Sequence, residues 1–150
     1  MNSKANKNPL AENPDCIFCK MVTGEIPCFT VYEDNETLAF VSLQYSSKGQ
    51  VLVIPKDHIE NIYGFSDELA CRVMITAKKV AIAVKNALDA DGVNFIMNNE
   101  EAAGQVIFHS HLHIIPRFNN DNLKHWPAYD YAEGEREIFK EKIAEELKNK

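Results

Sequence analysis

The sequence predicts an α+β protein with a mainly antiparallel sheet, one long helix in the middle of the chain and a second helix at its end. Three observations support this class. Short β-favouring runs outnumber the helical segments. Residues 67–88 repeat their apolar side chains with the period of a helix, and residues 133–148 repeat them four apart. Strands with few helices between them are typical of α+β domains.

The expected strands are defined by residue type and by the turns between them. Asp34-Asn35 separates the first two, which predicts a hairpin. The third is a continuous apolar run that Pro55 ends, as in a buried strand. A polar loop, residues 98–104, precedes the last. The five expected strands cover residues 30–33, 37–42, 51–54, 93–97 and 106–116.

The long central helix has clear start and stop signals. Ser66 is a suitable N-cap, and Asp67 and Glu68 follow in the first turn, where the helix dipole favours acidic groups. Asp91-Gly92 ends the segment as a turn. Its apolar face consists of Leu69, Val73, Ala77, Val80, Val84 and Leu88. In the terminal helix the matching residues are Phe139, Ile143 and Leu147.

Length and charge limit the possible functions. A chain of 150 residues favours one domain, and residues 1–14 are expected to form a flexible polar tail. The net charge of −6 argues against a nucleic-acid surface, although a small phosphate needs only a few local donors. No apolar run is long enough for a membrane span or a signal peptide, so we expect a cytoplasmic protein. Its four cysteines are then unlikely to form disulfides.

Three of the five histidines alternate in one expected strand: His109, His111 and His113. Side chains two apart share one face of a strand, and Leu112 and Ile114 would face the core. If this face of the strand only faced solvent, Lys, Thr or Glu would be expected there and not three histidines. One metal held by all three rings conflicts with the roughly 13 Å between the ends of the row. We therefore favour a row of imidazoles that contacts an anionic substrate.

The histidine segment resembles the H-x-H-x-H-x-x signature of the histidine-triad (HIT) family. The similarity extends over residues 15–118, the expected HIT domain, and leaves residues 119–150 as a C-terminal extension. Further motifs with this resemblance, in the family's order, are Cys16-Ile17-Phe18-Cys19-Lys20, Leu52-Val53-Ile54-Pro55-Lys56, Gly104-Gln105 and Pro116-Arg117.

The resemblance implies a homodimer in which each subunit has a five-stranded antiparallel sheet and a packed helix. It implies an AMP-like purine nucleotide as ligand, and hydrolysis at its α-phosphate by a nucleoside phosphoramidase or nucleotidyl hydrolase. By motif position His111 corresponds to the nucleophile of a nucleotidyl-histidine intermediate. His113 corresponds to a phosphate contact that also donates to the leaving group. The alternative is a nucleotide-binding sensor or scaffold protein with little turnover.

The resemblance also implies substrate-binding positions. Asn98 and Gln105 match polar contacts near the phosphate, with loop capping as the alternative. Ser42 stands where the family often has an Asp that holds the ribose, and Val106 stands where a Ser is frequent. Three apolar residues resemble positions of the base pocket and could equally belong to the core: Ile17, Phe18 and Ile26.

A second group of residues suits a metal. Cys16 and Cys19 form a Cys-x-x-Cys pair, which fits a tetrahedral zinc that has two further ligands. Some HIT proteins resemble this arrangement, with His58 and His109 as the other two ligands. Such a closed site would make the zinc structural. The alternative is a pair of free thiols with His58 at the surface; a redox role is disfavoured because no βαβ pattern follows.

Overall fold

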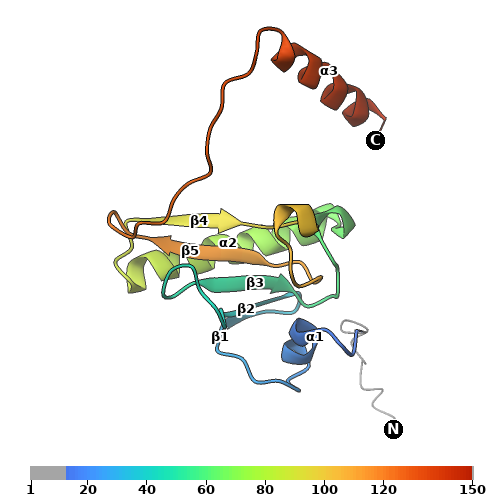
Figure 1. Ribbon diagram of the computed structural model, residues 1–150. Coiled ribbons are helices and arrows are strands. Elements are labelled where there is room, and N and C mark those ends of the chain that lie inside the picture. Colours follow the sequence, from blue (N-terminus) through green and yellow to red (C-terminus); the bar gives the residue numbers. More distant parts are fainter. Residues whose placement is uncertain (1–12, 150) are drawn as a thin grey trace.

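A computed structural model describes residues 13–149 as a five-stranded antiparallel sheet with helices on both faces (Figure 1). The expected fold class is confirmed. Of the tail proposed for residues 1–14, residues 1–12 lie outside the described part of the chain. The strands are β1 (Thr30–Glu33), β2 (Thr37–Val41), β3 (Val51–Pro55), β4 (Gly92–Ile96) and β5 (Leu112–Arg117), in the order β1-β2-β3-β5-β4. The helices are α1 (Ile17–Val22), α2 (Asp67–Ala87) and α3 (Glu135–Lys148).

The sheet carries a separate apolar cluster on each face, because successive residues of a strand point in opposite directions. Ala39 of β2 and Leu112 and Ile114 of β5 pack with the apolar face of α2, as the alternation predicts. Leu38 and Phe40 of β2 pack with α1 on the other face. The face with α1 also receives His113, because Leu52 is its partner across the β3–β5 ladder.

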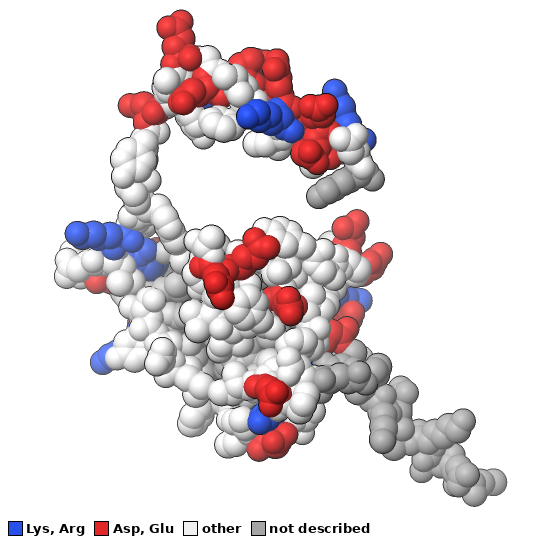
Figure 2. All heavy atoms as spheres, turned by 45° about the vertical axis from the view of Figure 1, so that its right-hand side comes forward, with Lys and Arg blue, Asp and Glu red and all other residues white. Residues whose placement is uncertain are grey.

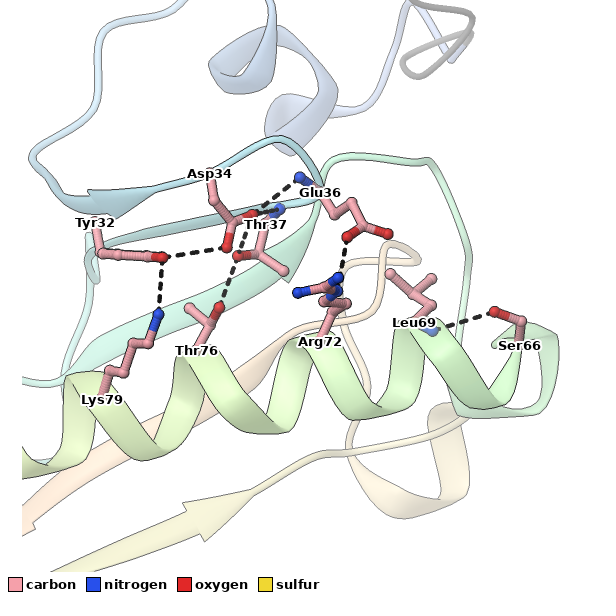
Figure 3. Close-up of polar contacts among 9 residues, drawn as sticks. All are labelled: Tyr32, Asp34, Glu36, Thr37, Ser66, Leu69, Arg72, Thr76 and Lys79. Atoms are coloured by element: carbon pink, nitrogen blue, oxygen red, sulfur yellow. Dashed lines mark hydrogen bonds and ion pairs between the residues drawn. The ribbon is translucent and has the colours of Figure 1, made fainter.

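Polar contacts fix α2 against the β1–β2 hairpin (Figure 3). The Ser66 hydroxyl accepts the N–H of Leu69 at 3.1 Å, which confirms the expected N-cap. Thr76 of α2 and Thr37 of β2 are both buried and share a hydroxyl hydrogen bond of 2.9 Å. The Thr37 hydroxyl gives its hydrogen to Asp34, so Thr76 is the donor of this bond and neither hydroxyl is left unpaired. The pair sets the position of α2 along the strands.

The carboxylate of Asp34 closes the β1–β2 hairpin. Its Oδ1 accepts the N–H of Glu36 at 2.9 Å and the N–H and hydroxyl of Thr37 at 2.7 and 2.9 Å. Burial alone would raise the pKa of Asp34, but these hydrogen bonds outweigh it and lower the pKa below its ordinary value.

Substituting Asp34→Ala is expected to lower the free energy of unfolding by about 1–2 kcal/mol at pH 7. A carboxyl whose pKa is depressed by folding stabilises the protein above its unfolded-state pKa and loses that contribution as the pH falls. The difference in the free energy of unfolding between the two proteins should therefore become smaller below about pH 4. Urea denaturation of both proteins at pH 7 and at pH 3 measures this difference at each pH. A difference that grows with acidification contradicts the assignment.

The expected strand over residues 106–116 is wrong in its first half. Strand β5 begins at Leu112, so His109 and His111 precede it in irregular backbone. The reason lies in Ser110, whose N–H and hydroxyl both donate to the carbonyl of Ile59, at 2.7 and 2.8 Å. These bonds tie the segment to the chain that follows β3 and replace a regular ladder.

Helix α1 was not expected from the sequence. Its six residues are too short for a helical period to be recognised. It begins at Cys16, whose sulfur accepts the N–H of Cys19. Among the helices of residues 13–149, none has both the length and the apolar character that crossing a bilayer requires.

Candidate functional site

A cleft of about 480 Å³ opens on the face of the sheet that carries α1. Its apolar wall includes Phe18, Phe40 and Leu52, and its polar wall includes His111 and His113. A cavity with an apolar side and a few convergent polar groups is typical of small-ligand sites. The cleft also receives Ser42, Asn98 and Val106 from three different loops.

The ring of His111 is held in one tautomer. Its Nδ1 lies 2.8 Å from the carbonyl oxygen of His109, and since a carbonyl only accepts, Nδ1 must donate. Nε2 of a neutral ring then keeps a free lone pair. Burial lowers the pKa of His111, although the bond to the His109 carbonyl acts in the opposite direction. The arrangement provides a neutral, oriented nitrogen at the wall of the cleft.

His113 lies beside His111, with 4.9 Å between the ring centroids. Burial and the neighbouring His111 lower the pKa of His113 to about 4, so this ring is also neutral at pH 7. Its Nδ1 lies 2.9 Å from the side-chain amide nitrogen of Gln50. Sequence reasoning missed Gln50, because a single polar residue before a buried strand carries no motif.

The expected phosphate contacts separate into two kinds. Asn98 lines the cleft and donates its amide to the carbonyl of Gly104 at 3.3 Å. Gln105 is buried, accepts the N–H of Glu100 at 2.7 Å and donates to the carbonyl of Ile107 at 3.1 Å. The Gln105 amide also donates to the carbonyl of Glu60 in the segment after β3, so it joins two loops. Its predicted contact with a phosphate stays a prediction.

The expected ribose and base contacts also differ in their placement. Ser42 lines the cleft, but its hydroxyl donates to the carbonyl of Gln44. Phe18 lines the cleft from α1. Ile17 and Ile26 are instead partly buried side chains packed against the apolar cluster of α1 and β2, outside the lining of the cleft. This packing agrees with the core alternative, and a contact of these two residues with a base stays a prediction.

Cys16, Cys19, His58 and His109 converge at one end of the cleft, with ligand atoms within 4.8 Å of one another. The Cys19 sulfur lies 3.2 Å from Nδ1 of His58 and 3.6 Å from Nδ1 of His109. Tetrahedral bonds of about 2.0–2.3 Å place neighbouring ligand atoms about 3.5 Å apart. The spacing and the donor types therefore fit a tetrahedral metal ion.

Burial determines the protonation of two side chains in this cluster. Burial lowers the pKa of His109 to about 4, and its Nε2 donates to the carbonyl of Pro55 at 2.9 Å, which leaves Nδ1 free to ligate. Burial and the adjacent Cys16 raise the pKa of Cys19 to about 11. Cys19 therefore holds its proton at pH 7, and a metal ion bound here would displace it, because the thiolate is the form of cysteine that ligates. His109 turns its ligating nitrogen toward the cysteines, whereas His111 and His113 line the cleft.

A protein-family model described as the HIT domain matches residues 23–120. This chain belongs to the histidine-triad family. Among its HIT relatives, Protein hit of Bacillus subtilis (strain 168) is 50% identical over 108 residues, which cover 72% of this chain and 73% of the relative. The adenosine 5'-monophosphoramidase of Schizosaccharomyces pombe is 36% identical over 135 residues, covering 89% and 98%.

Solved structures agree with this fold. A crystal structure of a protein from Streptococcus mutans UA159 superposes with a TM-score of 0.86 at 39% identity, covering 91% of this chain and 88% of the other. A zinc-bound histidine-triad family protein from Mycobacterium smegmatis superposes with a TM-score of 0.71 at 31% identity, covering 91% and 98%. Each match covers 91% of this chain, which is more than residues 13–118 make up. The agreement therefore extends beyond the sheet.

Proposed function

We propose that this HIT protein hydrolyses purine nucleotides at the α-phosphate, as a nucleoside phosphoramidase or related nucleotidyl hydrolase, through a covalent nucleotidyl-His111 intermediate. The observation that carries the proposal is the orientation of His111. Its Nδ1 is committed to the His109 carbonyl, so the lone pair of Nε2 belongs to a buried, neutral ring in the cleft wall. Such a nitrogen is an activated nucleophile.

In the proposed reaction His111 Nε2 forms a bond to the α-phosphorus while the bond from phosphorus to the leaving amine breaks. The departing nitrogen accepts a hydrogen bond from Nε2–H of His113 and takes up a proton from solvent, so that it leaves as the free amine. Water then attacks phosphorus, the bond between phosphorus and Nε2 breaks, and AMP leaves. The proton that this water loses returns to solvent, and both rings end as they began. The relative named adenosine 5'-monophosphoramidase supports an adenosine substrate.

Rapid mixing with adenosine 5'-monophosphoramidate, followed by an acid-free quench and intact-mass spectrometry, tests the intermediate. We expect a transient adduct of one AMP per chain, located on the peptide that contains His111. Hydrolysis without any adduct would contradict covalent catalysis. AMP binding without product formation would favour the sensor or scaffold function, whose support is Ser42, since its hydroxyl is engaged by the Gln44 carbonyl.

For the metal cluster we propose a structural zinc on Cys16, Cys19, His58 and His109. The support is a closed set of four ligands whose atoms lie within 4.8 Å of one another. When bound, zinc would supply folding energy and a fixed backbone, with no open position for chemistry. The zinc-bound relative from Mycobacterium smegmatis agrees with this choice of metal.

We also propose a homodimer held in part by the C-terminal extension, residues 119–150. No residue of α3 is buried, and the helix stands away from its own sheet (Figure 1). Figure 2 shows charged side chains along α3, yet Phe139, Ile143 and Leu147 are 47%, 62% and 69% exposed. An isolated helix of this length is marginal in water, so a second subunit is the simplest partner for its apolar face.

A chain that ends at Leu123 should dimerise at least about tenfold more weakly than the full chain, a loss of about 1.4 kcal/mol. The physical reason is the loss of apolar burial by α3 and the aromatic residues before it. Sedimentation equilibrium measures the dissociation constant of both chains. Full-length protein that remains monomeric at 100-fold the concentration used for activity assays would contradict the dimer.

We propose a cytoplasmic location for the same reasons that the sequence indicates one. All four cysteines are free thiols, and two of them would be metal ligands that an oxidising compartment would endanger. Fractionation of cells that express the full chain tests this proposal. Recovery with the periplasmic or secreted fraction would overturn it.

A further inference from the structure

We infer that Gln50 is a positioning residue that sets the tautomer of His113, so that this ring presents its Nε2–H as a hydrogen-bond donor to the cleft. The inference rests on the proposed function and deepens it. Gln50 is only 4% exposed and precedes β3, directly beneath the cleft that it helps to line. A buried amide at this place must satisfy both of its polar ends.

The orientation of the Gln50 amide follows from Ser46. The N–H of Ser46 lies 2.9 Å from one end of the amide, and because a backbone N–H only donates, that end must be the oxygen Oε1. The other end is therefore the NH₂ group. It lies 2.9 Å from Nδ1 of His113. Since the NH₂ group also only donates, Nδ1 must accept and cannot carry a proton.

A neutral imidazole with a bare Nδ1 carries its proton on Nε2. Burial keeps His113 neutral near pH 7. His111 and His113 therefore have opposite tautomers, because one ring faces an acceptor and the other faces a donor. An acceptor, the His109 carbonyl, leaves His111 with a lone pair on Nε2, and a donor, the Gln50 amide, leaves His113 with a hydrogen there. The nucleophile and the hydrogen-bond donor are therefore distinguished before any substrate binds.

Nitrogen-15 NMR of the full-length protein with labelled histidine tests the tautomer directly at pH 7. In the unmodified protein we expect His113 to show a bare Nδ1 and a protonated Nε2. Gln50→Glu keeps an oxygen for the Ser46 N–H and replaces the donor by an acceptor, so Nδ1 of His113 should become protonated. A protonated Nδ1 in the unmodified protein, or an unchanged spectrum in Gln50→Glu, overturns the inference.

Activity separates positioning from a general structural effect. Gln50→Leu should lower kcat/KM by about tenfold for an amine leaving group, which must be protonated as it departs. An ester of AMP with p-nitrophenol has a leaving group that needs no proton, and its hydrolysis should change by less than about twofold. Equal losses on both substrates would contradict the donor role.

The control is Asn86→Leu, which removes an amide on the exposed side of α2 and should leave both rates unchanged. If the unmodified protein hydrolyses neither substrate, the proposed function fails, whereas the NMR result still decides the tautomer. Thermal melting of all variants shows whether they are folded.

Discussion

Replacing His111 by Asn should abolish turnover while nucleotide binding persists. We expect kcat for adenosine 5'-monophosphoramidate to fall by on the order of 10⁴-fold, the scale seen when a covalent nucleophile is removed. The amide of Asn can still donate to the His109 carbonyl and partly fill the buried position, but it has no nucleophilic lone pair on nitrogen. The fold and the rest of the cleft wall should therefore survive.

Two measurements complete this test. Calorimetric titration with AMP should give a dissociation constant within about threefold of that of the unmodified protein, less than 1 kcal/mol. His125→Asn is the matched control, since His125 is exposed on the C-terminal extension and lies outside the cleft. Equal rates for His111→Asn and the unmodified protein would end the claim that His111 is the nucleophile.

Loss of the cysteine ligands should have the largest effect on stability. We expect the double variant Cys16→Ser, Cys19→Ser to lose its zinc and to melt at a markedly lower temperature. A ligand at about 1,000 times its dissociation constant stabilises the folded state by about 4 kcal/mol, and this contribution would disappear. The buried serines would add unsatisfied hydroxyls next to Phe18 and Leu38.

The chain provides its own control for this experiment. Cys28→Ser, Cys71→Ser removes two thiols outside the metal cluster and should keep one zinc per chain. Elemental analysis after gel filtration measures the stoichiometry, and calorimetry measures the melting temperature. Stoichiometric metal in the Cys16, Cys19 variant would place the ion on the histidine triad and contradict the four-ligand site.

Much of the fold could be predicted because periodic burial leaves a strong trace in the sequence. The apolar stripe of α2 with its Ser66 cap, and the run before Pro55, are direct consequences of packing on a sheet. The expected strand through His109 and His111 was wrong because one side chain, Ser110, diverts the backbone with two bonds to Ile59. A contact between residues that distant in the chain leaves no local pattern.

In the candidate site, too, local patterns could be predicted and distant contacts could not. The Cys-x-x-Cys spacing and the family resemblance together grouped Cys16, Cys19, His58 and His109, and the structure assembles this group. Residue type alone could not separate Asn98, which lines the cleft, from Gln105, whose buried amide bonds to the backbone of its own loop and of Glu60. Both are amides beside a phosphate-like loop, and only their hydrogen-bond partners distinguish them. Gln50 was missed for the same reason, since its importance depends on which nitrogen of His113 it faces.

The partner that orients His111 is a main-chain oxygen. Every amino acid that could stand at position 109 carries the same oxygen, so no side-chain replacement there deletes it. Variants of His109 thus perturb the metal cluster chemically while they leave this acceptor in place. A substitution can change the orientation of His111 through this oxygen only by moving the backbone. The two bonds from Ser110 to the Ile59 carbonyl hold that backbone, so Ser110 is the side chain to replace.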